Sequence, residues 1–166
     1  MSLATPGPDD YRIIKMSLAR FFTIGKDQYP QDMIDIYGGF GDPWSVIESL
    51  VGNSATYALL KPASSGDNET TLGFMGVQLM WPGVGRMWAV SLEPGQGHGL
   101  ALTLACRHMV EKVAASWGLH RVEITLMRVK VWSRRVAKVL RFEIEADKMA
   151  RYSTTRDDYM LAARNF

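Results

Sequence analysis

A glycine-rich segment in the middle of the chain has the residue types and spacing of a phosphate-binding turn. Gly95, Gly97 and Gly99 stand within residues 92–101, between an apolar, strand-like stretch and an apolar helical pattern. The first N–H groups of a helix have no partner inside it and carry the positive end of its dipole, and glycines let the backbone approach phosphate oxygens. The segment therefore predicts an anion site, although a purely structural turn between a strand and a helix has the same composition.

The spacing in this segment argues against the better-known phosphate motifs. It is not Gly-x-Gly-x-x-Gly after an opening strand, and it lacks the Gly-Lys-Ser/Thr ending of a P-loop. The three histidines are scattered and match no carboxylate pattern, so we predict no metal site. The single cysteine, Cys106, excludes a disulfide framework.

Hydrophobic periodicity predicts the elements that would position this turn. Short, turn-rich connections indicate antiparallel neighbours in the first half of the sheet. Apolar residues at spacings of three and four indicate helices, and Gly118 is a stop signal for the first of the two. The predicted elements in chain order are strands at 55–60, 71–80 and 85–92, a helix at 102–117, a strand at 122–126, a helix at 132–140 and strands at 142–152 and 158–165. This order predicts an α/β protein of the α+β type, with helices packed on a mixed sheet.

The N-terminal third has weaker patterns. Residues 1–10 contain two prolines and a glycine and are predicted as a flexible leader, followed by one domain over residues 11–166. The stretch 11–16 fits a strand or a helix. Helices are expected at 32–37 and 43–51, because an aspartate followed by proline is a typical helix start.

The residues Gln96 to Ala101 read Gln-Gly-His-Gly-Leu-Ala and resemble the coenzyme A loop of the GNAT acetyltransferases, Gln/Arg-x-x-Gly-x-Gly/Ala. The element order over roughly residues 55–166 is similar to the core of that family. Phe142 and the closing segment 158–164 also resemble that core. The chain is similar to divergent members of the family that bacteriophages encode. The resemblance implies the GNAT fold, a mixed, mostly antiparallel twisted sheet with helices on both faces.

The resemblance also implies where acetyl-coenzyme A or coenzyme A would bind. The strand at 87–92 would splay from the strand at 122–126 and leave a slot for pantetheine. A basic cluster near the expected adenosine phosphates consists of Arg128, Lys130, Arg134 and Arg135, although a solvated helix face would have the same composition. The implied cofactor contacts are the main chain of Val90, Ser91 and Leu92, the loop residues Gln96, Gly97, His98, Gly99, Leu100 and Ala101, and Arg128 and Arg134.

Two departures from the family pattern bear on activity. Pro94 stands one residue closer to Gln96 than is usual, and Ala137 stands where the family has the tyrosine that protonates the leaving thiolate. Two functions therefore stay open. One is an acyl-coenzyme A-dependent N-acetyltransferase that acts on a primary amine of a small molecule or protein. The other is a non-catalytic GNAT-fold protein that binds a partner protein, with or without coenzyme A.

Acyl transfer to an amine needs the amine deprotonated and the carbonyl polarised. Glu93 is the candidate base, directly or through water, and Tyr152 or Tyr159 is the candidate acid in place of the missing tyrosine. His98 is expected to contribute its backbone rather than its ring. Each of these residues also suits an ordinary structural role.

The charge distribution is uneven. Residues 1–70 carry a net charge of −4 and residues 71–166 a net charge of +6. A basic half suits a phosphorylated ligand, and an acidic half favours a cationic acceptor, although ordinary solvated faces would have the same charge distribution. The basic run 128–141 lacks the interleaved aromatics of a nucleic-acid reader, and neither a membrane-spanning run nor a signal sequence is apparent. We therefore predict a cytoplasmic protein, in the host cytoplasm if it is phage-encoded, that binds neither nucleic acid nor membrane; a homodimer stays open.

Overall fold

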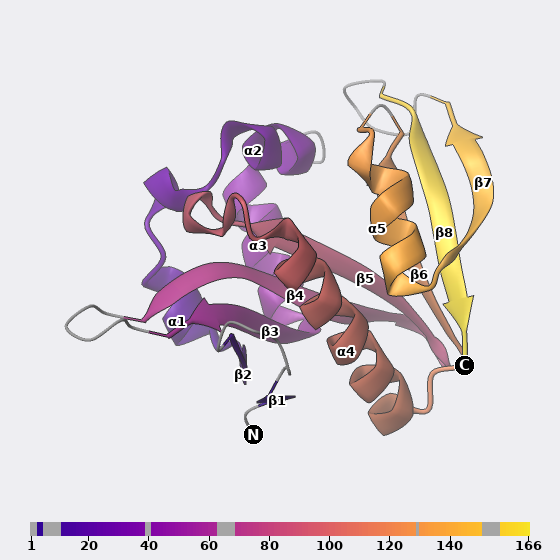
Figure 1. The fold of residues 1–166 in the computed structure, drawn as a ribbon, viewed down its shortest axis with the longest axis horizontal. Coiled ribbons are helices and arrows are strands. Elements are labelled where there is room, and N and C mark those ends of the chain that lie inside the picture. Colours follow the sequence, from indigo (N-terminus) through magenta and orange to yellow (C-terminus); the bar gives the residue numbers. More distant parts are fainter. Residues whose placement is uncertain (1–2, 5–10, 39–40, 63–68, 129, 151–156) are drawn as a thin grey trace.

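The computed structural model describes residues 3–4, 11–38, 41–62, 69–128, 130–150 and 157–166. The strands of these ranges join into one eight-stranded sheet in the order β1-β2-β3-β4-β5-β6-β8-β7 (Figure 1). They are β1 (Leu3–Ala4), β2 (Arg12–Lys15), β3 (Ser54–Lys61), β4 (Thr70–Trp81), β5 (Val84–Ser91), β6 (Arg121–Met127), β7 (Glu143–Met149) and β8 (Tyr159–Asn165). Neighbouring strands pair antiparallel, except that β5 and β6 are parallel. This is the mixed, mostly antiparallel sheet that the sequence predicted.

Helices cover both faces of the sheet (Figure 1). The helices are α1 (Leu18–Phe22), α2 (Gln31–Gly38), α3 (Pro43–Gly52), α4 (Gly99–Trp117) and α5 (Trp132–Leu140), with short 3-10 turns η1 (Lys26–Gln28) and η2 (Glu93–Gly95). Side chains of a strand alternate between the faces, so Met75 packs in the core under α4 and α5, whereas Phe74 packs in the core under α1 and α3. The sheet therefore separates two hydrophobic cores.

Local signals explain where two of the helices begin and end. The Asp42 carboxylate accepts a 2.8 Å hydrogen bond from the Ser45 N–H and Pro43 occupies the first turn, which confirms the predicted start of α3. Gly118 adopts a left-handed conformation with φ of 62° and ends α4, also as predicted. Helix α4 begins at Gly99, directly after the glycine-rich segment.

The structure decides or corrects three expectations for the N-terminal part. The stretch 11–16 contains strand β2, which settles the choice between strand and helix. Helix α1 was not predicted, because at five residues it is too short for periodicity, although Ser17 caps it by accepting from an N–H three residues on. Leu3 pairs with Ile13 between β1 and β2, so this part of the expected leader belongs to the sheet; residues 1–2 and 5–10 lie outside the described residues.

None of the helices within the described ranges combines the length and the apolar character that crossing a membrane requires.

Candidate functional site

Strands β5 and β6 pair at one end and then separate. The residues in register are Val84 with Arg121, Gly85 with Val122, and Arg86 with Glu123. Beyond Arg86, β5 stays paired with β4 as far as Ser91, and β6 stays paired with β8 as far as Met127. Each strand keeps its outer neighbour while the two diverge, so a gap opens inside the sheet. This is the splay that the sequence resemblance implied.

The pleat of β5 decides which main-chain groups face this gap. The Leu92 N–H donates a 3.0 Å hydrogen bond back to β4, whereas the Ala89 carbonyl accepts a 3.0 Å hydrogen bond from the Tyr37 hydroxyl. Main-chain groups of successive strand residues point to opposite edges. Ser91 therefore faces the gap as Ala89 does, and Val90 faces β4. Of the three residues predicted to contact the cofactor through their main chain, Val90, Ser91 and Leu92, only the main-chain groups of Ser91 face the gap.

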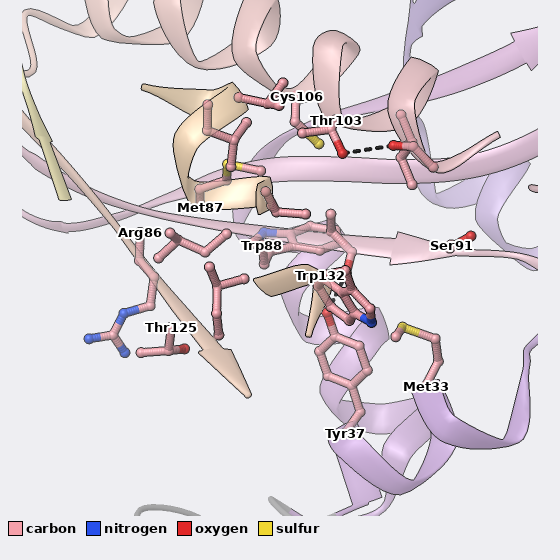
Figure 2. Close-up of a pocket in the computed structure, with 18 of the residues that line it drawn as sticks. Met33, Tyr37, Arg86, Met87, Trp88, Ser91, Thr103, Cys106, Thr125 and Trp132 are labelled. Carbon is pink, nitrogen blue, oxygen red and sulfur yellow. Dashed lines mark hydrogen bonds between the residues drawn. The ribbon is translucent and has the colours of Figure 1, made fainter. Parts of the chain in front are cut away.

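The gap is part of a cleft of about 870 Å³ (Figure 2). Its walls come from α2, α3, β5, β6, α5 and the first turns of α4. Most of the described residues that line it are apolar, and the side chains labelled in Figure 2 include Met33, Met87, Trp88, Cys106 and Trp132. Among the lining residues that the structure describes, the charged side chains are Arg86 and Arg135, and there is no aspartate, glutamate or histidine.

The glycine-rich loop lies at one end of the cleft. Gly95 must be glycine, because a Cβ there would lie 2.0 Å from the Leu72 carbonyl oxygen. Gly97 has φ of +87°, which residues with a side chain rarely adopt. A Cβ at Gly97 or Gly99 would meet no atom within 4 Å. The outer surface of the loop is therefore open at the two positions where a ligand would approach the backbone.

The hydrogen bonds of the loop show which of its N–H groups are free. The Gln96 N–H donates to the Glu93 carbonyl at 3.1 Å, and the His98 N–H donates to the Gly95 carbonyl at 2.9 Å. The His98 Nδ1 also shares a 2.8 Å hydrogen bond with the Tyr11 hydroxyl. Within residues 95–101, all of which the structure describes, the N–H groups without a backbone acceptor are those of Gly97, Gly99, Leu100 and Ala101. The predicted anion site is thus narrowed to these four donors, while the Gln96 and His98 N–H groups stabilise the loop.

Two tyrosines and the cysteine lie along the cleft on different elements. Burial raises the pKa of Tyr37 on α2, and negative charge on Tyr159 or Cys106 would raise it further. Burial also raises the pKa of Tyr159 on β8, with a smaller contribution from Asp157. It raises the pKa of the Cys106 thiol on α4 to about 12. All three groups therefore hold their protons at neutral pH.

The structure separates the predicted catalytic residues. Glu93 is exposed in η2 and is not among the described residues that line the cleft. Tyr159 lines the cleft, as the sequence-based alternative required. Tyr152 lies outside the described residues.

Some members of the predicted basic cluster pair with a carboxylate outside the cleft, and another lines the cleft. Arg128 lies 3.6 Å from Asp147 of β7, and Arg134 also pairs with that carboxylate. Arg135, the next residue of α5, lines the cleft. Of the predicted cluster, Arg135 is therefore the described residue that lines the cleft, while Arg128 and Arg134 pair with Asp147.

Ala137 points into the core and not into the cleft. It is 1 % exposed and packs in the cluster between α4, α5 and the sheet. The residues of α5 that line the cleft are Trp132, Arg135, Val136, Val139 and Leu140. A tyrosine at position 137 would consequently enter the core.

Sequence reasoning missed the contributions of α2 and of the first turn of α5. Met33 and Tyr37 are four residues apart, so a helix would place both on one face. Nothing in that spacing indicates that the face meets β5. Trp132 lines the cleft because of how α5 packs, which helical spacing alone does not show.

The sequence matches no protein-family model and no curated protein. Solved structures show the same fold across nearly the whole chain. A GNAT-family acetyltransferase from Bacillus anthracis superposes with a TM-score of 0.70 at 14% identity, covering 99% of this chain and 98% of that one. An IAA acetyltransferase from Bacillus cereus gives 0.67 at 17% identity, covering 95% and 100%. A ribosomal-protein α-N-acetyltransferase in complex with coenzyme A gives 0.65 at 12% identity, covering 96% of each chain. The fold is therefore that of the GNAT acetyltransferases.

Proposed function

We propose that this protein is a GNAT-type N-acyltransferase that binds acyl-coenzyme A in the cleft and transfers an acetyl group to a primary amine. One arrangement carries the proposal. Strands β5 and β6 separate beyond Arg86, and the cleft that results reaches the free N–H groups at the start of α4. The shared fold with acetyltransferases, one of them in complex with coenzyme A, supports it.

The residues around the cleft fit coenzyme A. The four free N–H groups at the start of α4, together with its helix dipole, would hold the pyrophosphate over the open backbone at Gly97 and Gly99. The Ser91 and Ala89 main chains would bind the pantetheine amides along the splayed part of β5. Arg135 would place a positive charge beside the same ligand.

Bound acyl-coenzyme A would supply a thioester, whose C–S bond breaks while the C–N bond to the acceptor amine forms. One proton must leave the amine nitrogen, and one must reach the departing sulfur. Tyr37 and Tyr159 hold their protons at neutral pH, so the Oη of either could donate one in the cleft. We assign this role first to Tyr37, because its hydroxyl reaches the β5 main chain.

A non-catalytic function is the second candidate. It is favoured by one observation: the described lining of the cleft contains no carboxylate or imidazole to serve as a base. In that case, the cleft would bind coenzyme A, or would lack a ligand, and another surface would bind a partner protein. Formation of an acylated product separates the two functions.

Thermal melting with coenzyme A and acetyl-coenzyme A, combined with a product assay on a broad amine panel, tests the proposal. A ligand at a hundred times its dissociation constant stabilises the native state by about 2.7 kcal/mol, so melting should rise by several degrees. A folded protein with no shift at millimolar ligand would exclude the cofactor. A clear shift without any acylated product would favour the binding function.

A further inference from the structure

We propose that the acceptor is a small monoamine with an otherwise apolar body, and not a polyamine or another amine with several positive charges. The inference rests on the proposed acyl transfer and concerns the chemistry of the same cleft. Its basis is the kind of side chain that the cleft presents to an acceptor and the sign of the charges among them.

The acceptor side of the cleft is mostly apolar. The glycine-rich loop and α4 lie on one face of the sheet, so an acceptor that meets the thioester from the other face approaches between α2, α3 and β5 (Figure 1). The apolar lining residues on that side or at its mouth are Pro30, Met33, Val46, Leu50, Trp88 and Trp132, and the polar ones are Tyr37, Gln78, Arg86 and Thr125. An apolar acceptor gains about 25 cal/mol for each Å² that it buries against them.

The charges at the cleft have one sign. Arg86 and Arg135 line it, and no described lining residue is acidic. Glu123 lies 3.7 Å from Arg86, but it is also 3.1 Å from Arg121 and does not line the cleft. With Arg135 assigned to coenzyme A, a second ammonium group on the acceptor would lose its water near Arg86, without a carboxylate of the described lining to pair with.

The overall charge distribution of the sequence gives a different expectation. The acidic N-terminal half suggested a cationic acceptor, yet the acidic residues of α2 and α3 whose side chains the structure describes, Asp35 and Glu48, are exposed and do not line the cleft. Charge counted along the sequence does not distinguish a residue on the outer face of a helix from one on its inner face.

An apolar cleft also helps to prepare the nucleophile. Removing an ammonium group from water lowers its pKa, so a single amine in this cleft is shifted toward the neutral, reactive form. The amine would then need no carboxylate base at this place. The missing base and the apolar lining are consistent with one kind of substrate.

The size of the cleft fits a small-molecule acceptor. Small-molecule sites commonly have volumes of about 300–1,000 Å³. The cleft has about 870 Å³, and the pantetheine arm would fill part of it. The room that remains suits an amine of modest length.

Three amines of equal chain length test the proposal: hexylamine, 6-aminohexanoate and 1,6-diaminohexane. We expect kcat/KM with acetyl-coenzyme A to be at least about tenfold higher for hexylamine than for the diamine, because a buried unpaired polar group is rejected strongly. The amino acid should fall between them, since Arg86 Nε is buried and has no hydrogen-bond partner among the described residues. If 6-aminohexanoate is as poor a substrate as the diamine, the cleft excludes a second polar group whatever the sign of its charge. That result also supports an apolar acceptor. A diamine as good as hexylamine would overturn the proposal.

Met33→Glu provides a second test, because it adds a carboxylate to the cleft from α2. Met33→Gln is the matched control of similar shape without the charge. The preference for the diamine over hexylamine should rise about tenfold in the glutamate variant relative to the glutamine variant. An unchanged ratio in two folded variants would contradict an acceptor position between α2 and β5.

Binding of the same amines to the coenzyme A-loaded protein distinguishes failure of this proposal from failure of the proposed function. If hexylamine binds more tightly than the diamine but no amine is acylated, the acyltransferase function fails while the apolar character of the cleft stands. If other amines, such as peptide N-termini, are acylated and hexylamine neither binds nor reacts, the function stands and the monoamine proposal is wrong.

Discussion

The Tyr37 hydroxyl donates a 3.0 Å hydrogen bond to the Ala89 carbonyl oxygen, so a side chain of α2 reaches the main chain of β5 where that strand has left β6. Figure 2 shows Tyr37 extending from its helix into the cleft. The bond fixes α2 against the splayed strand. It also brings a protonated phenol to the place where the thioester is expected.

Tyr37→Phe should lower the acyl-transfer rate by about 10²-fold, because general-acid help is typically worth 10² to 10⁴. Steady-state kinetics with hexylamine would measure it, with Tyr159→Phe in parallel. Tyr57→Phe on β3, which is outside the described cleft lining, is the control and should keep its rate. A loss confined to Tyr159→Phe would move the acid to β8, and equal rates in all variants would exclude a tyrosine acid.

Gly99→Asp should fold normally and lose coenzyme A binding. A Cβ at Gly99 meets no atom within 4 Å, so the side chain has room, but its carboxylate would repel a pyrophosphate over the loop. His98→Ala should weaken binding less than about tenfold, because its N–H already bonds to Gly95. Calorimetry would compare the two variants, and equal affinities would mean that the phosphates bind elsewhere.

Ala137→Tyr should destabilise the protein by about 1–3 kcal/mol and should not raise the rate, since overpacking a filled core carries that cost. Ala137 is 1 % exposed in the core between α4 and α5. Val136→Tyr is the matched variant. Val136 is the neighbour of Ala137 and lines the cleft, so the same side chain is added on the cleft side of α5. Denaturant unfolding and kinetics would test both, and a faster, equally stable Ala137→Tyr enzyme would contradict the packing of α5.

Stability should fall as pH rises from about 9 toward 12, partly through Cys106. Burial raises the pKa of this thiol from 9.0 to about 12, so the unfolded chain loses the proton first and is favoured across that window. The expected contribution is about 1.4 kcal/mol for each pH unit. Between pH 8 and pH 11, the melting temperature should therefore fall less with rising pH for Cys106→Ala than for the wild type. An equal fall of the melting temperature with pH in both proteins would indicate that the thiol is not buried as described.

Much of the fold follows from the sequence because it depends on local patterns. The turn-rich connections around β4 and β5, the three-and-four spacing in α4, and the stop at Gly118 depend on neighbours within a few residues. The glycine-rich segment is equally local, since a strand that runs into glycines and then a helix leaves N–H groups free at that point. The sequence did not predict helix α1, because its five residues are too few for a periodic pattern.

The lining of the cleft was decided by the tertiary structure. Which main-chain groups of β5 are free depends on the partner that each edge of the strand finds, so Ser91 faces the gap while Leu92 is bonded to β4. Tyr37 reaches Ala89 across 52 positions of sequence, and Arg135 rather than Arg134 lines the cleft because of how α5 packs on the sheet. Helical spacing shows which residues share a face, but the element that meets that face is set by long-range packing, which no pattern of neighbouring residues encodes.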